Sequence, residues 1–380
     1  MKKINFSEPF LADGELSNIM DVFDQLKFYG AGKFTAICEE RIKKVTGSKV
    51  ALLTDSCTSA LEIVSLLLRD FGKRQQVIIP SYTFTSTASA FARAGFEIVF
   101  CECTDDNMMI DLKDVEEKIT EHTVAIIPVH YGGLAADIVA VCGLAQKYDL
   151  LVVEDAAQSF NSFFKGQHLG TFGTFGCFSF HETKNIHCGL GGALVINDEK
   201  YFDRARHIWE RGTNRQEVLK GLVDKYSWVE IGGSFYPTEL QAAFLAAQLE
   251  KLPENLEKRE TIYHAYSSGL IGLKNDRRLH FPCPESNYQS NYHAFFIIFN
   301  SDVDADGVRE YLASHKVHSY IGYVPLHSSP VGLRMGYSAD SLPRTEELSK
   351  RVLRLPFHNN MTTEDAKRIS SLINGYFDEK

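Results

Sequence analysis

Lys184 and Asp155 each stand at the end of an apolar segment that is typical of a buried strand. Asp155 ends LLVVED (150–155), and Lys184 follows GCFSF (176–180) within the stretch SFHETKN. A lysine in a pocket can form a covalent bond to a carbonyl carbon. A buried carboxylate needs a cation or donors, and a protonated ring nitrogen is one such partner. A neighbouring arginine or a helix cap would serve Asp155 equally well.

Small hydroxyl residues and aromatic rings follow two other apolar segments. In TDSCTSALEIV, the residues Ser56 to Ser59 lead from a strand into a helix, and a helix N-terminus rich in N–H groups can bind phosphate. Simple helix capping would explain the same pattern. In PSYTFTSTASA, Tyr82 and Phe84 lie just beyond a strand, where a ring can cover a flat ligand or pack in the core.

Together these features predict a site for pyridoxal 5′-phosphate. The lysine bonds to the cofactor aldehyde, and the carboxylate keeps the pyridine nitrogen protonated so that the ring accepts electrons. The helix N-terminus holds the phosphate, and Phe84 covers one face of the ring.

An α/β domain must position these groups. Apolar segments alternate with stretches of helical period, such as SALEIVSLLLRDF and IVAVCGLAQKYD, which favours a mostly parallel sheet with helices on both faces. Ligands of such sheets bind at the carboxyl ends of the strands. The predicted strands are 50–54, 76–81, 97–103, 124–130, 150–155, 176–180 and 192–198.

A second, smaller α+β domain is expected after residue 250. A long helical stretch begins near Pro237 and breaks near Pro253, and shorter strands and helices follow, including YHAFFIIFN and DGVREYLASH. We therefore divide the chain into a large cofactor-binding domain with an N-terminal arm (1–250) and a small C-terminal domain (251–380).

The composition excludes several classes of function. The chain has 380 residues and a net charge of −9, which argues against nucleic acid or an anionic membrane surface as the main partner. No apolar segment approaches the ~18 residues that span a bilayer, and no secretory signal is visible. The eight cysteines form no CxxC pair, so we expect free thiols and a cytoplasmic protein.

Three apparent motifs fail on inspection. GAGK (30–33) lacks the Ser or Thr that follows a P-loop lysine, so we expect a loop. DVDADG (302–307) begins like a calcium loop, but Ala313 occupies the twelfth position, so we expect an Asp-rich helix start instead. The histidines form no HExxH pair, and no metal site is expected.

Five stretches of the sequence occur in an order and spacing that is found in a known family. They are SCTSALE, PSYTFTSTASAF, VEDAAQS, SFHETKN and ELQAAFLAAQLEKL. Through them the chain resembles the sugar aminotransferases of the DegT/DnrJ/EryC1/StrS family over nearly its whole length. The resemblance implies the aspartate-aminotransferase fold (type I) and a homodimer with active sites at the subunit interface. SFHETKN and KGLVDKYSWVEIGGSFYPTELQAA are most similar to the branch that acts on TDP-4-keto-6-deoxyhexoses.

The resemblance also assigns roles by position. Lys184 bonds to the cofactor and carries protons, Asp155 pairs with the pyridine nitrogen, and Gln158 lies near the 3-oxygen. Phe84 stacks on the ring. The phosphate is assigned to the backbone amides of Cys57 and Thr58, the hydroxyl of Ser179, and, from the partner subunit, Ser234, where many relatives have asparagine.

Two positions depart from the family pattern. Leu190 lies in GLGG where relatives have a glutamate, and Gly322 lies in IGYVPLH where relatives often have a histidine. Both departures concern the sugar site or its loops and leave the cofactor set intact.

The expected reaction moves the amino group of L-glutamate to TDP-4-keto-6-deoxy-D-glucose and gives a TDP-4-amino-4,6-dideoxyhexose for cell-surface polysaccharide or deoxysugar synthesis. Amination at C3 and a UDP substrate remain open. A cofactor-dependent sugar dehydratase would have histidine in place of Lys184. A cofactor-sensing regulator would carry a DNA-binding segment, which is not visible, and a hydrolase using Cys57 or Ser56 would need a GxSxG-type pattern.

Overall fold

The computed structural model describes residues 2–69, 72, 75–284, 287–300, 303 and 305–378. A seven-stranded sheet forms the centre of the larger part, in the order β1-β9-β8-β5-β4-β2-β3. Neighbouring strands are parallel except on either side of β9. The predicted α/β fold with a mostly parallel sheet is therefore confirmed. The strands are β1 (Val50–Thr54), β2 (Gln76–Pro80), β3 (Glu97–Cys101), β4 (Thr123–Ile126), β5 (Leu151–Asp155), β8 (Phe175–Ser179) and β9 (Gly192–Ile196).

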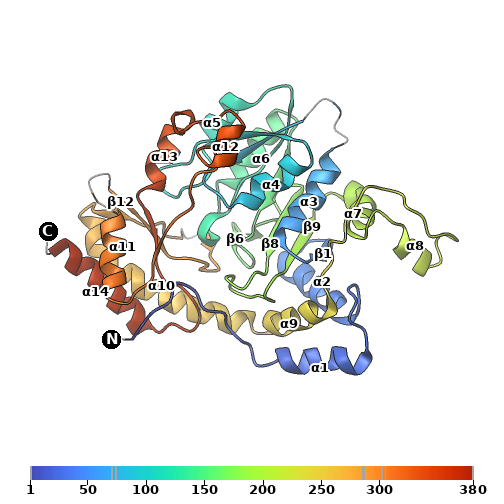
Figure 1. Cartoon of the computed structure of the whole chain (residues 1–380), viewed down its shortest axis with the longest axis horizontal. Coiled ribbons are helices and arrows are strands. Elements are labelled where there is room, and N and C mark those ends of the chain that lie inside the picture. The colour runs from blue at the N-terminus through green and yellow to red at the C-terminus, as the bar shows by residue number, and fades with distance from the viewer. Residues whose placement is uncertain are drawn as a thin grey trace.

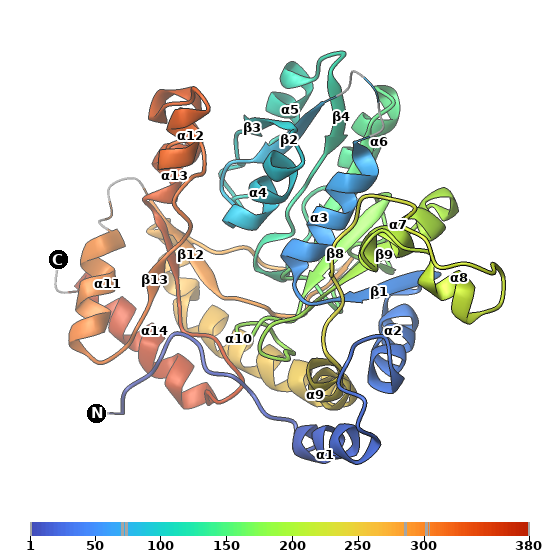
Figure 2. The same cartoon turned by 45° about the vertical axis from the view of Figure 1, so that its right-hand side comes forward.

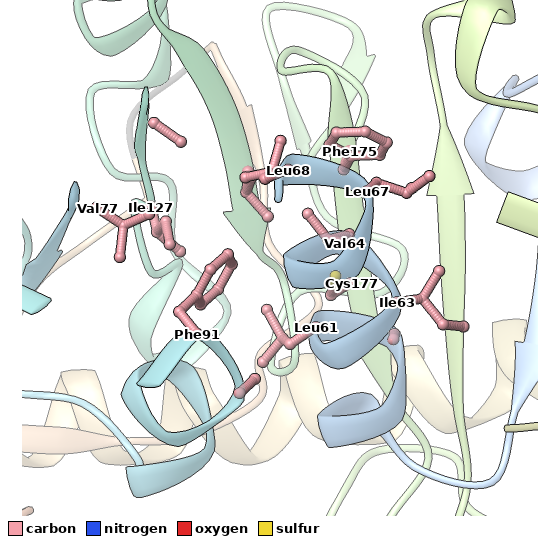
Figure 3. Packing of buried hydrophobic residues seen from close by; sticks show 14 of the residues in the cluster. Leu61, Ile63, Val64, Leu67, Leu68, Val77, Phe91, Ile127, Phe175 and Cys177 are labelled. Carbon is pink, nitrogen blue, oxygen red and sulfur yellow. The ribbon is translucent and has the colours of Figure 1, made fainter. Parts of the chain in front are cut away.

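Helices cover both faces of this sheet (Figure 1). On one face lie α3 (Cys57–Leu68), α4 (Thr85–Arg93) and α7 (Phe202–Trp209). Figure 3 shows Leu61, Val64 and Leu68 of α3 packed beside Phe91 of α4. The other face is covered by α2 (Lys33–Thr46), α5 (Leu112–Lys118), α6 (Ile138–Lys147) and α9 (Glu239–Glu250), and α1 (Glu15–Gln25) packs on α9. Two buried apolar layers thus hold the sheet edge that carries the polar strand ends.

The predicted break in the long helix lies at Lys251, between α9 and α10 (Leu252–Asn275). Pro253 stands in the first turn of α10, where a missing N–H costs no helical hydrogen bond. Beyond it, a second sheet has the order β10-β12-β14-β13. Figure 2 shows this sheet beside α10, α11 and α14. The elements are β10 (Leu279–His280), β12 (Phe296–Phe299), β13 (Tyr320–Ile321), β14 (Val352–Arg354), α11 (Ala305–Ser314) and α14 (Thr363–Asp378).

The N-terminal segment reaches this second sheet, because Ile4 pairs with Val317 and packs in the same apolar cluster. The exact division of the chain near residue 250 stays a prediction. The remaining elements are β6 (Phe163–Phe164), β7 (Gln167–His168), β11 (Tyr288–Gln289), α8 (Arg215–Leu219), α12 (Pro330–Arg334), α13 (Pro343–Ser349) and the short helices Tyr131–Gly133, Glu199–Tyr201 and Ala339–Ser341.

The structure bears on three further sequence expectations, of which one changes. The strand expected at 124–130 ends at Ile126, and the chain beyond Pro128 pairs with β5 only through a bridge from Val129 to Asp155. The segment 30–33 is a loop that ends where Lys33 begins α2. The Asp-rich helix start expected at 302–307 falls partly on residues 302 and 304, which lie outside the described residues.

In the described chain, no helix is both long and apolar enough to cross a membrane.

Candidate active site

Lys184 lies in a loop that begins where β8 ends. The loop is closed by backbone hydrogen bonds from Phe180 N–H to Gly191 (2.8 Å) and from Cys188 N–H to Phe180 (3.0 Å), and the Lys184 N–H bonds to His181 (2.8 Å). Among the described residues, none forms a hydrogen bond or ion pair with the Lys184 amine. Burial lowers the pKa of Lys184 to about 8, so a large fraction of the amine is uncharged in mildly alkaline solution.

The next residue, Asn185, fixes this loop to the second part of the chain. Its side-chain amide donates to the backbone oxygen of Asn291 (2.6 Å), and its amide oxygen is 2.9 Å from Nδ1 of His293. Asn255 of α10 in turn donates to the backbone oxygen of Asn185 (2.6 Å). The loop that carries the lysine is therefore tied to α10 and to the segment before β12.

Asp155 ends β5 and is only 5% exposed. The Thr87 hydroxyl donates to one carboxylate oxygen (2.7 Å), and the Ala157 N–H donates to the other (3.1 Å). Burial raises the pKa of Asp155, and the nearby charge of Lys184 opposes this rise. No arginine within the described ranges pairs with Asp155. Each oxygen of the Asp155 carboxylate accepts one hydrogen bond and can accept another, so a cationic ring nitrogen can be a further partner.

The preceding residue, Glu154, has a separate set of partners. Its carboxylate accepts hydrogen bonds from the backbone N–H groups of Gly170 (2.6 Å), Phe172 (2.7 Å) and Gly173 (2.7 Å). The fourth partner is Nε2 of His130, at 2.8 Å. Glu154 is completely buried and holds the turn before β8. It is a structural acid, whereas Asp155 is the candidate for chemistry.

The N-terminus of α3 has the free donors that a phosphate requires. Ser56 caps the helix by accepting from the Ser59 N–H (3.1 Å). The N–H groups of Cys57 and Thr58 donate to no acceptor in the described chain. A Cβ atom added at Gly192 would overlap the backbone of Ser56 and Cys57, so this glycine allows β9 to approach the helix start.

The other predicted cofactor residues are distributed around this edge. Gln158 is buried, accepts from the Gly132 N–H (2.7 Å) and donates to the Tyr323 hydroxyl (3.1 Å). Ser179 is the buried last residue of β8. Phe84 precedes α4, three residues before Thr87; its side chain is 58% exposed, and its ring centroid is 6.2 Å from that of Tyr323.

Ser234 is exposed and pairs with Glu210, and within the described chain it contacts none of the other predicted site residues. One chain thus brings together Cys57, Asp155, Ser179 and Lys184, but not Ser234.

Sequence reasoning missed Thr87, Tyr323 and Arg354. Arg354 lies close enough to Lys184 for its charge to lower the pKa of that amine further.

The site can be compared with known proteins. The model of the DegT/DnrJ/EryC1/StrS aminotransferase family matches residues 11–374. The chain belongs to this family. A Methanocaldococcus jannaschii protein that is described as uncharacterised is 29% identical over 375 residues, which are 96% of each chain.

Solved structures of similar fold cover the whole chain. Helicobacter pylori PseC, an aminotransferase involved in the biosynthesis of pseudoaminic acid, has a TM-score of 0.91 at 24% identity, over 100% of both chains. DesV of S. venezuelae has a TM-score of 0.88 at 27% identity, over 99% of both chains. The predicted aspartate-aminotransferase fold is therefore confirmed.

This member of the family is a sugar aminotransferase, and the prediction of pyridoxal 5′-phosphate as its cofactor is confirmed. The residues present fit that group: α3 offers two free N–H donors for the phosphate, Asp155 offers a buried carboxylate, and Lys184 offers an amine of lowered pKa. The role of each residue stays a prediction.

Proposed function

We propose that this sugar aminotransferase moves the amino group of L-glutamate to TDP-4-keto-6-deoxy-D-glucose and forms a TDP-4-amino-4,6-dideoxyhexose. The observation that supports the chemistry is the buried edge on which Lys184, Asp155 and the α3 N-terminus meet. The choice of substrate rests on SFHETKN and on the stretch 220–243, which are most similar to the branch acting on such sugars. Deoxysugar or cell-surface polysaccharide synthesis would use the product.

Each residue has one task in the proposed reaction. When bound, the cofactor accepts the electron pair that remains as the donor loses its Cα proton. Lys184 in its uncharged form would take that proton from Cα of the donor and later give it to C4′, the aldehyde carbon of the cofactor. Asp155, anchored by Thr87, stays anionic beside the ring nitrogen and keeps that nitrogen protonated. Cys57 and Thr58 hold the phosphate through their N–H groups.

The working unit that we propose is a homodimer with active sites at the interface. Large apolar side chains are exposed along the segment that follows α8, where Trp228 is 77% exposed. Figure 2 shows α8 and this segment extending away from the sheet. Contiguous exposed apolar surface marks an interaction site, and the nearby Ser234 is the residue expected to reach the partner's cofactor. The exposed apolar residues of this surface are Leu219 at the end of α8 and, beyond it, Leu222, Val223, Tyr226, Trp228, Val229 and Ile231.

We also propose a cytoplasmic location, because all eight cysteines are free thiols and six of them are buried. Neither Leu190 nor Gly322 removes a group from the cofactor site: Leu190 is exposed, and its backbone oxygen accepts from Gln241 (2.8 Å). We therefore expect Leu190 and Gly322, the two departures from the family pattern, to affect the binding of the sugar and not that of the cofactor.

Purified holoenzyme incubated with L-glutamate and a panel of keto-sugar nucleotides tests the proposal. The panel contains 4-keto and 3-keto 6-deoxyhexoses linked to TDP or UDP, and NMR identifies the aminated carbon. We expect amination at C4 of the TDP-linked 4-keto sugar. Product only from a 3-keto sugar would establish the C3 alternative, and no product from any of them would reject the assignment.

A further inference from the structure

His293 is a buried histidine in the segment that leads into β12, and hydrogen bonds fix the backbone of this segment. Arg259 of α10 donates to the backbone oxygen of His293 (2.6 Å). Two residues earlier, the side chain of Asn291 donates to the backbone oxygens of Gln158 (2.9 Å) and Phe160 (3.0 Å). The segment is therefore held against the loop that follows β5 and carries one of the predicted cofactor residues.

The side chain of Asn185 decides which ring nitrogen of His293 carries a proton. The amide nitrogen of Asn185 donates to the backbone oxygen of Asn291 (2.6 Å). The amide oxygen is therefore the atom that lies 2.9 Å from Nδ1 of His293. Because an amide oxygen only accepts hydrogen bonds, Nδ1 must be the donor.

The His293 ring has no second proton. Burial holds the pKa of the ring well below its ordinary value, and the charges of Lys184, Arg259 and Arg354 lower it further. The ring is therefore uncharged, and Nε2 carries a lone pair. The residue is only 6% exposed, and within the described ranges Nε2 has no hydrogen-bond partner, although it is not sealed from solvent. A free acceptor at this depth calls for a donor that the chain does not supply.

This lone pair belongs to the active site. Asn185, which holds Nδ1 of His293, is the residue that follows Lys184 in the chain. The charge of Lys184 acts on the ring, and the charge of Arg354 acts on both the ring and the lysine amine. A substrate carbon that reacts beside Lys184 therefore comes close to His293.

The two proposed substrates differ in what they can donate to Nε2. The carboxylates of L-glutamate have no proton to donate, so their oxygens would meet a lone pair. An ammonium group would add a positive charge beside that of Arg354. A keto-6-deoxyhexose carries a neutral hydroxyl on the carbon next to its keto group. An uncharged acceptor among cations suits this hydroxyl best.

We propose that Nε2 of His293 accepts a hydrogen bond from the sugar hydroxyl that adjoins the keto carbon. In TDP-4-keto-6-deoxy-D-glucose this group is the 3-hydroxyl. The inference rests on the proposed function and deepens it, because it names a residue that recognises the sugar. Asn185 is a positioning residue in this arrangement: it holds the proton on Nδ1 and so leaves Nε2 free to accept.

Two substitutions separate the two nitrogens of His293. His293→Asn keeps a donor near the position of Nδ1, which can still bond to Asn185, and removes Nε2. His293→Gln places an amide oxygen near the position of Nε2 and gives up the bond to Asn185. If His293 only supported Asn185, His293→Gln would be the more damaging change.

The measurement is the half-reaction of the pyridoxamine phosphate form of the enzyme with the keto-sugar nucleotide that wild type aminates, followed by stopped-flow absorbance. We expect its second-order rate constant to fall about tenfold in His293→Asn and less than about 3-fold in His293→Gln. The half-reaction with L-glutamate should change less than about 2-fold in His293→Asn, since the donor does not use Nε2. Thermal unfolding and cofactor content check that each variant is folded and loaded.

A sugar without the hydroxyl completes the test. The probe is the TDP-linked 4-keto-3,6-dideoxyhexose, which lacks the 3-hydroxyl. In wild type, its rate constant should be about tenfold below that of the 3-hydroxy sugar, whereas in His293→Asn the two sugars should react alike.

Two outcomes would overturn the inference alone. One is a larger loss of the sugar half-reaction in His293→Gln than in His293→Asn, with both variants folded and loaded. The other is an equal penalty for the missing hydroxyl in wild type and in His293→Asn. Failure of the proposed function has a different signature: wild-type enzyme would then aminate no keto-sugar nucleotide, and the inference would fail with it.

Discussion

A Cβ atom added at Gly322 would overlap the hydroxyl oxygen of Tyr82. Tyr82 is 1% exposed, so its ring has little freedom to move aside. The sequence marks Gly322 as a departure from a family pattern that often has histidine there. In the structure, the phenol of Tyr82 occupies the space that a side chain at position 322 would need, so the glycine and this tyrosine depend on each other.

Replacing Gly322 by alanine should therefore lower the stability of the protein. We expect a cost of about 2 kcal/mol, since overpacking a buried site typically costs 1–3 kcal/mol. In the double variant Gly322→Ala/Tyr82→Phe the loss should be smaller than the sum of the single losses, because removal of the hydroxyl relieves part of the overlap. Thermal unfolding of holoenzyme measures all four proteins. Strictly additive shifts would mean that the two residues do not interact.

Capture of the cofactor by apoenzyme should depend on pH through Lys184. The uncharged amine attacks the aldehyde, and burial lowers the pKa of this amine to about 8. The rate of reconstitution, followed by absorbance near ~420 nm, should fall about tenfold per pH unit below pH 8 and level off above it. Lys184→Ala should show no such absorbance and no turnover. A rate that still rises steeply between pH 9 and 10 would indicate an ordinary lysine.

Asp155→Asn should lower kcat about 100-fold with the fold retained, because a neutral amide cannot keep the ring nitrogen protonated. Thr87→Val removes one donor to that carboxylate but leaves its charge. We expect the loss in Thr87→Val to be about tenfold or less. Steady-state assays with L-glutamate give both values. An Asp155→Asn enzyme at the wild-type rate would assign the ring nitrogen to another partner.

Trp228→Glu should weaken the proposed homodimer, because it places a charge on the exposed apolar segment after α8. Val139→Glu is the control, since Val139 is also exposed but lies on α6, away from that segment. Analytical ultracentrifugation should show a higher dissociation constant for Trp228→Glu alone. Equal sedimentation of both variants and wild type would place the interface elsewhere.

Mixed dimers test whether Ser234 serves the partner's site. Lys184→Ala and Ser234→Trp should each be nearly inactive by themselves. Unfolded together and refolded at equal amounts, they should regain about a quarter of wild-type activity, because half of the dimers carry one site in which both residues are intact. No regained activity, despite formation of dimers, would show that Lys184 and Ser234 act from the same chain.

The sequence predicts the large sheet well because its strands are covered on both faces and are therefore apolar throughout. All seven segments form strands, and most bounds agree within two residues. The exception, β4, is shorter because Pro128 has no N–H to offer a ladder. The residues at the carboxyl edge were predictable for the same reason. Asp155 ends one apolar segment, Lys184 lies in the loop after another, and the two segments form the neighbouring strands β5 and β8.

Arg354 could not be found in this way. It lies in the other sheet, in a stretch that has no recognisable spacing relative to Lys184, and its closeness to that lysine appears only after folding. Asn185 is a similar case: it follows the lysine in the family pattern, but its bonds to Asn291 and His293 are long-range contacts. Sequence periodicity describes elements, whereas these two roles depend on how separate elements meet.

The acids Glu154 and Asp155 are adjacent, yet strand geometry sends their side chains to opposite faces of β5. Glu154 binds three backbone N–H groups of the turn before β8, and Asp155 faces the helix that carries Thr87. A directed-evolution library that randomises both positions would therefore select on two different properties. Variants at 154 would be lost as insoluble or unfolded protein, whereas variants at 155 would accumulate as well-expressed enzyme that turns over slowly.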